Sequence, residues 1–462
     1  FVITPGPQRT VRRVIVDGLA TTRSRLVTDR IELKSGDPLS LSKTTDSERR
    51  LYDLGIFARV NTALQNPDGL ETSKYVLYEL EEARRYSLNF GIGAQVGRIG
   101  GGTSLSAPAG ATGFSPRVSF GVTRLNVMGL GHTVTLQTRL SNIQQQAAVS
   151  YLAPQFIGSQ NLSLNFTTLY DSSHDIRTFS AIRREASVQL SQKLSRANSL
   201  QYRLVFRRVT QGQLLINPLL VPLLSQPVRV GLIGMSFIQD KRDDPADSHR
   251  GTYTTIDAGY ASRYLGSQTT FSRIAARNST YYRVGRDFVL ARSTYFGWVQ
   301  RISGVSFIPL SERFFSGGSA SIRAFPENQA GPRDTVTGFP LGGNAMLINN
   351  VELRFPLLGD NLGGVLFHDA GNVYDDVRDI SFRFRQHNLQ DFNYMVQSVG
   401  VGIRYRTPIG PVRFDLSFSP NSPRFYGLKG SFDDFLNPNI HLPSVNQRIN
   451  QFQFHFSLGQ AF

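Results

Sequence analysis

From residue 86 to the end of the chain, apolar and polar residues alternate with a period of two in most segments, although Phe288–Gln300 and Gly364–Ala370 are mixed. In the segment VGVGIRYR at 399–406, for example, apolar side chains occupy one face, and glycines and arginines occupy the other. About sixteen such segments of about ten residues follow one another, the strand length that a tilted membrane span requires. Long charged side chains on the second face fit a water-filled lumen better than the packed interior of a soluble sandwich. The pattern predicts an all-β transmembrane barrel of about 16 antiparallel strands over residues 85–462.

The connections between these strands fall into a short class and a long class. Short connections reverse the chain within a few residues, whereas long connections have room for loops of their own. An even number of strands brings both ends of a barrel to the same side, and outer-membrane barrels place their short turns on that periplasmic side. The expected short connections are 129–131, 195–198, 284–287 and 407–411, and the expected long ones are 211–228, 302–342, 372–393 and 420–448.

Residues 8–84 follow a different pattern, in which helical spacing occurs beside strand alternation. Turn residues at 17–18 and 36–38 divide this region, and Ser40 is a suitable N-cap residue. The expected order β-α-α-β-β predicts a small α+β domain. Phe1–Pro7 has no partner strand before it, so we expect it to be the end of a preceding domain. The expected elements are a strand at Val11–Val16, helices at Ser24–Leu33 and from Ser40 to about Leu54, and strands at Ala58–Leu64 and Tyr75–Glu82.

The composition narrows the class of protein. No run of about eighteen apolar residues exists, which excludes helical membrane spans, and the mean hydropathy is −0.20. Cysteine is absent, which excludes disulfides and thiolate chemistry. The formal net charge is +16, but the arginines are scattered through the strands rather than gathered in one patch. We therefore expect them to line a lumen or face anionic lipid head groups, and we expect no binding of nucleic acid.

The chain lacks the usual signatures of an enzyme or a metal protein. Its seven histidines are scattered without metal-ligand spacing, and no Gly-x-Ser-x-Gly nucleophile elbow occurs. The sequence therefore predicts no catalytic residues, no metal site and no cofactor. A passive porin is disfavoured as well, because a porin needs neither the N-terminal domain nor the long loop described next.

The connection between the expected strands Phe288–Gln300 and Leu347–Phe355 contains an unusual stretch, RFFSGGSASIRAFPENQAGPRD at 313–334. A loop of this length is usually either functional or disordered, and its aromatic residues argue against disorder. Such a loop can place apolar groups against a barrel wall and direct one guanidinium to a defined partner.

A buried arginine in this loop requires carboxylates around it, because an unpaired buried charge is very costly. Two acidic residues follow on the next two expected strands, Glu352 in VELRFP and Asp369 in FHDAGN. We therefore expect Arg323 to lie inside the barrel, within salt-bridge distance of one of them. For Arg333, near the end of the same stretch, we expect substitution by alanine to be nearly neutral.

Several segments of the chain resemble the BamA/TamA family of outer-membrane protein assembly factors. They are RFFSGGSASIRAF, GPRD, GGNAMLINNVELRFP, GGVLFHDAGNVY and the terminal FHFSLGQAF. Likewise TVRRVIVDGL, SGDPLS and RRLYDLGIFARV resemble a polypeptide-transport-associated (POTRA) domain. The resemblance implies a POTRA domain at 8–84, a sixteen-stranded barrel, and an inward loop at 301–342.

In that family the loop tip carries an Arg-Gly-Phe motif, which acidic residues on the barrel wall hold in place. The corresponding residues here are Ile322, Arg323, Ala324 and Phe325, and Glu352 and Asp369 are the expected anchoring acids. Alanine stands where the family has glycine, so the backbone at residue 324 is not expected to need a positive φ.

The resemblance also implies a function, the insertion of client β-barrel proteins through a lateral seam. The seam is expected between Tyr86–Val96 and Gln451–Phe462, with fewer backbone hydrogen bonds than other neighbouring strands have. A cysteine pair at Gln95 and Gln453 is the expected lock if the two residues face each other. Glycines of both strands and aromatic residues of the C-terminal assembly signal complete the expected site: Gly91, Gly93, Gly459, Phe456 and a lipid-facing Phe462.

The implied partners are unfolded outer-membrane protein clients and the lipid bilayer. The resemblance also allows periplasmic chaperones, accessory lipoproteins or an inner-membrane partner. The implied location is the outer membrane of a Gram-negative bacterium, with the POTRA domain in the periplasm. One alternative stays open, a two-partner-type secretion pore that exports a dedicated protein through the lumen.

Overall fold

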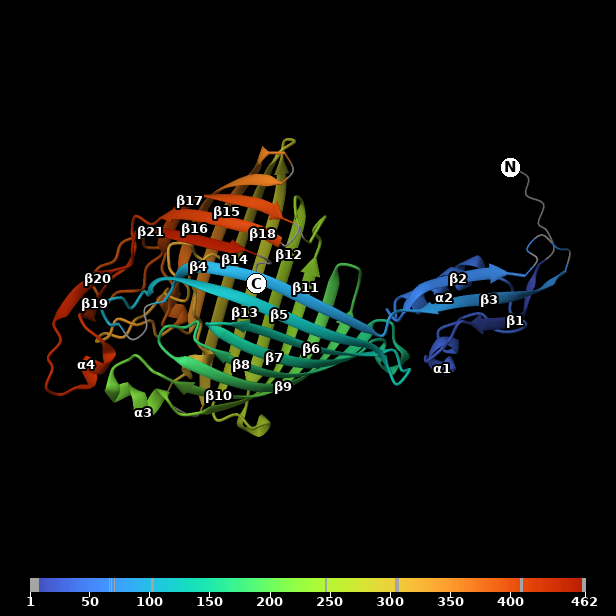
Figure 1. Ribbon diagram of the computed structural model, residues 1–462, viewed down its shortest axis with the longest axis horizontal. Helices are drawn as coiled ribbons and strands as arrows, with labels where there is room; N and C mark the ends of the chain where they lie inside the picture. Colours follow the sequence, from blue (N-terminus) through green and yellow to red (C-terminus); the bar gives the residue numbers. More distant parts are fainter. Residues whose placement is uncertain are drawn as a thin grey trace.

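The protein consists of a small N-terminal domain at one end of a large β-barrel (Figure 1). The computed structural model describes residues 8–458 except 66, 68, 70, 101–103, 246, 304–306, 360 and 408–409. Phe1–Pro7, expected to end a preceding domain, therefore lies outside the described residues. None of the helices in the described part of the chain has both the length and the apolar character to span a membrane.

The N-terminal domain has the predicted order β-α-α-β-β. Its strand β3 lies in the centre of the sheet, parallel to β1 and antiparallel to β2. Ser40 caps the second helix by accepting a hydrogen bond from the backbone N–H of Lys43. Leu51 from that helix and Tyr78 from β3 are fully buried in the domain core. The elements are β1 (Thr10–Asp17), α1 (Ser24–Thr28), α2 (Leu41–Tyr52), β2 (Phe57–Leu64) and β3 (Ser73–Glu82).

The first helix is shorter than predicted, because it ends at Thr28 instead of Leu33. Ile31 and Leu33 are nevertheless buried in the core of the domain, where they reach it from a non-helical segment. Apolar residues that are spaced like a helix can therefore meet the same core after the helix has ended. The prediction of a helix to residue 33 is wrong for this reason.

Sixteen antiparallel strands close the barrel, as the alternation predicts. Each strand pairs with its neighbour in the chain, except that β18 pairs with β21 and β21 pairs with β4. The strands are β4 (Tyr86–Gly100), β5 (Ala111–Val127), β6 (His132–Ser141), β7 (Gln144–Ala153), β8 (Leu162–Ser173), β9 (Ser180–Lys193), β10 (Asn198–Gly212), β11 (Val228–Asp240), β12 (Gly251–Ala261), β13 (Thr270–Val284), β14 (Phe288–Ser303), β15 (Ala345–Leu358), β16 (Leu362–Tyr374), β17 (Val396–Thr407), β18 (Gly410–Phe418) and β21 (Phe452–Leu458).

The remaining elements lie in the connections. A two-stranded hairpin and a short helix occupy the long connection between β18 and β21. Figure 1 shows them beyond the end of the barrel that faces away from the N-terminal domain. These elements are α3 (Val221–Leu224), β19 (Arg424–Leu428), α4 (Phe432–Leu436) and β20 (Ser444–Arg448), with 3-10 turns at Phe156–Gly158, Pro218–Leu220, Arg263–Leu265, Leu310–Glu312 and Val377–Asp379.

Side chains point alternately out of the barrel and into it, as the period of two predicts. Val399, Val401 and Ile403 of β17 keep 51%, 53% and 45% of their surface exposed, which large apolar residues tolerate when lipid covers them. On β18 the inward-facing Asp415 and Ser417 are almost fully buried. The polar face therefore points into a filled lumen.

The N-terminal domain touches the short connections of the barrel. The backbone N–H of Arg23 donates to the carbonyl oxygen of Gly129 at 3.0 Å, and Asn126 donates to Thr22 Oγ1 at 2.8 Å. Arg30 Nε also donates to Gln155 Oε1 at 2.5 Å. The side of the barrel with short connections is therefore the side that carries this domain.

Candidate functional site

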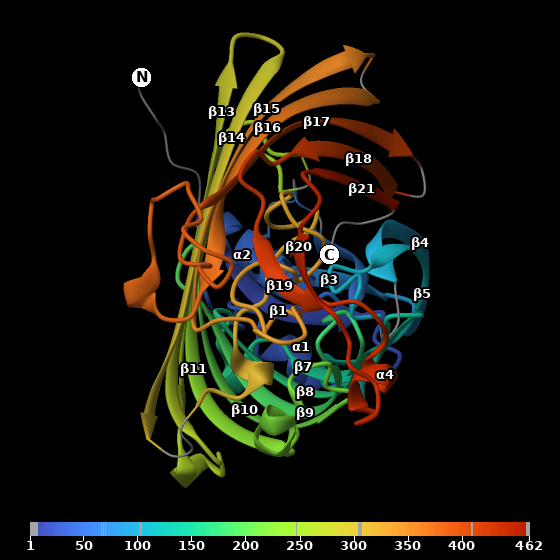
Figure 2. The same ribbon diagram turned by 90° about the vertical axis from the view of Figure 1, so that its left-hand side faces the viewer.

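The connection between β14 and β15 folds back into the barrel, where Figure 2 shows it within the ring of strands. Ile322, Ala324 and Phe325 have no exposed surface, and they pack in the same core cluster as residues of the barrel wall. We call residues 307–344 the inward loop. This loop occupies space in the lumen that water would otherwise fill.

Arg323 lies near the tip of the inward loop, and carboxylates surround it. Its Nε and Nη2 donate to the two oxygens of Asp369 at 2.8 and 2.7 Å, and its Nη1 donates to Glu352 Oε1 at 2.9 Å. Asp415 lies 3.8 Å away, and the guanidinium stacks on the ring of Phe367 at 3.4 Å from the centroid. The structure thus brings together the arginine and both acids that the sequence singled out.

Asp415 was missed at the sequence level, although a signal for it was present. In the segment VRFDLSF the apolar residues of β18 face lipid, so the alternation places Asp415 on the inward face. It also binds Arg404 at 2.7 Å, while Glu352 binds Arg354 at 2.8 Å. The wall acids are therefore shared with wall arginines, which compensates the excess of negative charge around a single loop arginine.

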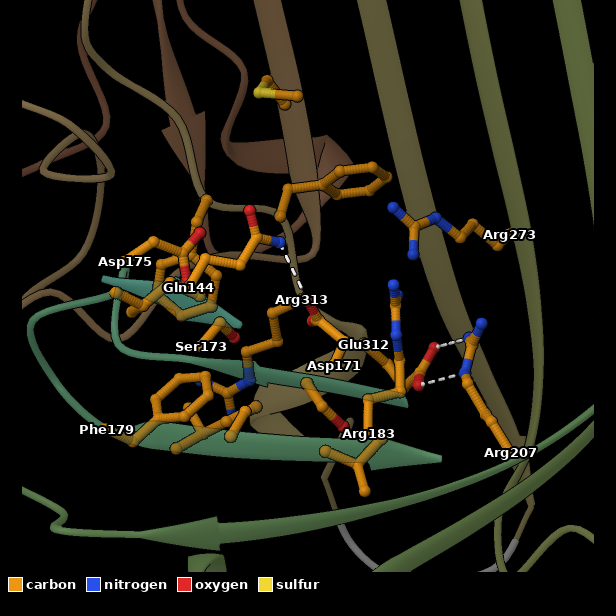
Figure 3. A pocket seen from close by; sticks show the side chains of 18 of the residues that line it. Gln144, Asp171, Ser173, Asp175, Phe179, Arg183, Arg207, Arg273, Glu312 and Arg313 are labelled. Carbon is orange, nitrogen blue, oxygen red and sulfur yellow. Dashed lines mark hydrogen bonds and ion pairs between the residues drawn. The ribbon is translucent and has the colours of Figure 1, made fainter. Parts of the chain in front are cut away.

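The base of the inward loop has a second anchor of opposite polarity. Glu312 of the loop is fully buried and accepts two hydrogen bonds from Arg207 of β10, through Nε at 3.1 Å and through Nη2 (Figure 3). Glu185 of β9 lies 3.9 Å from the same guanidinium. Because burial of a single charge is costly, this pair fixes the position of the loop base on the wall opposite to the tip anchor.

A cavity of about 440 Å³ lies beside this base anchor (Figure 3). Its charged lining is close to balanced, since Asp171 lies directly opposite Arg183 on the neighbouring strand and Glu312 binds Arg207. Within the described residues, no group of three or more histidines and acids is arranged to hold a metal ion. The charged residues that line the cavity are Asp171, Asp175, Arg183, Arg207, Arg273, Glu312 and Arg313.

Arg333, for which a nearly neutral alanine substitution was expected, is buried and makes several contacts that alanine would remove. Only 4% of its surface is exposed, and its guanidinium stacks on Phe425 at 4.2 Å from the ring centroid. It donates to the carbonyl oxygens of Gly338 and Gln329, both at 2.7 Å. Arg333 therefore ties the inward loop together at its outer end and holds it against the hairpin β19–β20.

Strands β4 and β21 meet at a seam with very little pairing. The described residues pair at three positions, Ala94 with Leu458, Gln95 with Ser457, and Val96 with Phe456. Among the described residues, the adjoining pair β18–β21 has seven such positions, from Val412 to Phe418. We call the contact between β4 and β21 the seam.

The expected residues of the seam are only partly placed there. Gly91 and Gly93 of β4 are not among the residues that pair with β21. They pair with Ser119 and Arg117 of β5, the other neighbour of β4. A Cβ atom at Gly91 would lie 2.5 Å from Ser119 Oγ, so this glycine makes room for a neighbour on β5. Gly459 and Phe462 lie outside the described residues.

Gln453 does not face Gln95 as the crosslink expectation assumed. It pairs with Ser417 on β18, and the partner of Gln95 across the seam is Ser457. The two positions differ by four residues and lie on the same face of the strand. The crosslink that tests the seam is therefore one between residues 95 and 457.

The inward loop touches both strands of the seam from the lumen. The carbonyl oxygen of Arg323 accepts a hydrogen bond from Ser417 Oγ at 2.6 Å and lies 3.4 Å from His455 Nε2 on β21. Four residues further on, Glu327 Oε1 accepts a hydrogen bond from Gln95 Nε2 on β4 at 3.2 Å. A single short segment of the loop thus bridges the seam.

Comparison with known proteins shows which family shares this arrangement. Residues 126–462 match the Omp85 superfamily domain, and residues 9–83 match the POTRA model described as a surface antigen variable number repeat. The chain belongs to the Omp85 superfamily. It is an outer-membrane β-barrel with a POTRA domain, which lies in the periplasm in this family.

Curated relatives of this Omp85 chain include two outer membrane protein assembly factors BamA. The one from Nitratidesulfovibrio vulgaris is 23% identical over 427 residues, which cover 90% of this chain and 49% of the relative. The one from Neisseria meningitidis serogroup B is 21% identical, and the match covers 90% of this chain and 55% of the relative. The chain spans about half the length of these relatives.

Solved structures share the fold. BamA from Haemophilus ducreyi lacking POTRA domains 1–3 superposes with a TM-score of 0.76 at 18% identity, covering 98% of this chain and 85% of that one. CdiB from Escherichia coli superposes with a TM-score of 0.55 at 12% identity, covering 98% of this chain and 76% of that one. Both likenesses concern the architecture of an Omp85 barrel with its N-terminal domain.

The alanine in the loop motif of this Omp85 chain leaves the backbone unstrained. Ala324 is not among the described residues with a positive φ, whereas Asn328, four residues later, has a φ of 57°. Gly317 has a φ of +125°, and a Cβ there would lie 2.3 Å from the carbonyl oxygen of Pro326. The conformational freedom of glycine is therefore needed at the start of the loop tip and not at residue 324.

Proposed function

We propose that this chain folds client β-barrel proteins and inserts them into the outer membrane through the seam between β4 and β21. The observation that carries the proposal is the seam itself, with three paired positions among the described residues against seven for β18–β21. In a bilayer, each backbone group without a partner costs several kcal/mol, so a sparsely paired seam opens more readily than any fully paired one. An opened edge offers a template for a client strand by β-augmentation.

The inward loop supports this proposal as the element that controls the seam. Arg323 fastens the loop to β15, β16 and β18 through Glu352, Asp369 and Asp415. Its own carbonyl oxygen lies beside His455 of β21, and Glu327 accepts a hydrogen bond from Gln95 of β4. A change in the position of the loop would therefore directly alter its contacts with β4 and β21. We propose that Ile322, Ala324 and Phe325 position Arg323 by filling the core around it.

A secretion pore through the lumen is the competing function. For that function the inward loop, which two charged anchors hold inside the barrel, would have to leave the lumen before an exported protein could pass. Both BamA relatives carry the name of assembly factors, which favours insertion. On this proposal the chain catalyses no covalent step, and its partners are unfolded barrel clients and the surrounding bilayer.

A disulfide across the seam tests the proposed function. In the full-length protein, which contains no cysteine in this part, Gln95→Cys and Ser457→Cys are introduced together. Residues directly opposite each other in an antiparallel pair are close enough for a disulfide. Insertion of a client barrel into vesicles should be lost after oxidation and restored by a reductant. Each single-cysteine variant should be insensitive to both treatments. Full activity of the crosslinked protein would refute lateral opening.

A further inference from the structure

Two loops on the outer side of the barrel meet above the seam. The first, at residues 104–110, follows β4, and the second, at residues 419–451, precedes β21. Ser104 forms an isolated antiparallel bridge with Ser431, and the backbone N–H of Leu105 donates to the carbonyl oxygen of Gly430 at 2.9 Å. The N–H of Gly430 in turn donates to Ser106 Oγ at 2.9 Å. We call Ser104–Ser106 and Gly430–Ser431 the outer clasp.

Apolar burial strengthens the outer clasp. Leu105 has no exposed surface and lies in a cluster with Leu215, Phe339 and Phe432, which come from three other loops of the outer end. Its carbonyl oxygen also accepts a hydrogen bond from Gln447 Nε2 at 3.0 Å. The clasp is therefore part of the hydrophobic cluster that the outer loops of the barrel form.

The strength of these contacts differs along the seam. Below the clasp, the described residues pair β4 with β21 at three positions, and Gln95 of β4 donates a hydrogen bond to Glu327 of the inward loop. In the clasp, backbone and side-chain hydrogen bonds combine with a leucine that is removed completely from solvent. Leu105 is fully buried, whereas the three paired residues of β4 are only partly buried, so apolar burial favours the closed clasp more than the closed ladder.

We propose that the outer clasp is a hinge, which stays closed while the seam ladder separates. This inference rests on the proposed lateral opening and adds its direction. The seam would part from the ladder side, and the two outer loops would keep β4 and β21 linked at their outer ends. An incoming client strand would then meet the open edge below the clasp.

Two crosslinks in the full-length protein test the hinge. One joins Ser104→Cys to Ser431→Cys in the clasp, and the other is the seam pair Gln95→Cys and Ser457→Cys. Because Ser431 also caps α4, the reduced form of each double variant is the reference for its own oxidised form. The clasp disulfide should leave client insertion into vesicles unchanged, whereas the seam disulfide should abolish it.

The other outcomes separate the two proposals. If both disulfides abolish insertion, lateral opening stands and the hinge is wrong, because the clasp must then open as well. If neither disulfide has an effect, the proposed function fails, and the hinge fails with it. If the clasp disulfide does not form under conditions in which the seam disulfide does, the two loops are not held together and the hinge is also wrong.

Discussion

Arg323 is the residue on which the most contacts of the inward loop converge. Arg323→Ala should lower the free energy of unfolding by roughly 3–5 kcal/mol, because Asp369 and Glu352 would lose a buried partner. Arg354→Ala is the matched control, since Arg354 also binds Glu352 but its side chain is 39% exposed. Denaturant unfolding in detergent and client insertion should both show a large effect for Arg323→Ala and a small one for Arg354→Ala. Equal effects of the two substitutions would contradict the account.

The glycine requirement of the loop gives a second test at the residue scale. Ala324→Gly should change the free energy of unfolding by no more than about 1 kcal/mol, because the backbone there has no positive φ. Gly317→Ala should destabilise far more, because the new Cβ would meet the carbonyl oxygen of Pro326. Thermal unfolding of the two variants beside the unmodified protein measures both effects. Stabilisation by Gly317→Ala would show that this reading of the loop is wrong.

Single residues also show what the sequence can and cannot reveal. Arg323 was predictable because an arginine between the aromatic residues of a loop, followed by acids on two strands, has few other arrangements with low energy. Glu312 and Arg333 were not, because nothing local distinguishes a buried charge in a loop from an exposed one. Arg207, the partner of Glu312, and Phe425, on which Arg333 stacks, reach these residues only through the tertiary fold.

At the scale of elements, one carboxylate orders the loop between β1 and α1, through which the POTRA domain contacts the barrel. Glu82, at the end of β3, accepts hydrogen bonds from the backbone N–H groups of Thr21 and Thr22 and from their hydroxyls. Burial works against the charged carboxylate, but these hydrogen bonds outweigh it and lower the pKa of Glu82 to about 2. Thr22 in turn accepts a hydrogen bond from Asn126, next to the first short turn of the barrel.

This depressed pKa predicts how the segment responds to acid. A carboxyl group with a lowered pKa in the folded state stabilises the fold above its unfolded pKa of about 4.3, and that contribution is lost as the pH falls toward 2. Amide hydrogen exchange at Thr21 and Thr22 should therefore become less protected between these values. In Glu82→Gln the protection should be lower at neutral pH and should lack this acid transition. An acid transition that survives in Glu82→Gln would contradict the assignment.

Elements were predictable where side-chain period and burial agree. The strands of the barrel fulfil this condition, since each has one lipid face and one lumen face, and a one-residue slip would reverse them. The helix α1 does not, because Ile31 and Leu33 reach the same core without helical backbone. The sequence could not predict the register of the seam, that is, which residue of β21 pairs with Gln95. A shift of four residues, from Ser457 to Gln453, keeps the same face and leaves the period unchanged.

At the scale of the whole molecule, the seam, the inward loop and the outer clasp form one connected system. The loop fastens itself to the wall at Glu312 and at Arg323, and it bridges the seam between His455 and Gln95. The POTRA domain lies at the opposite end from the clasp (Figure 1). A client delivered from the periplasm would therefore reach the seam before the cap of outer loops.

The central claim is that client strands enter at the opened seam between β4 and β21, and trapping a client during insertion tests it most directly. A cysteine at Gln95, one of the paired residues of the seam, is combined with single cysteines along the terminal strand of a client barrel. A cysteine at Arg273, which lines the luminal cavity, is the matched control. The account predicts disulfide adducts between the client and residue 95, and none with residue 273. Adducts with residue 273 alone would contradict it, because they would place the client inside the lumen.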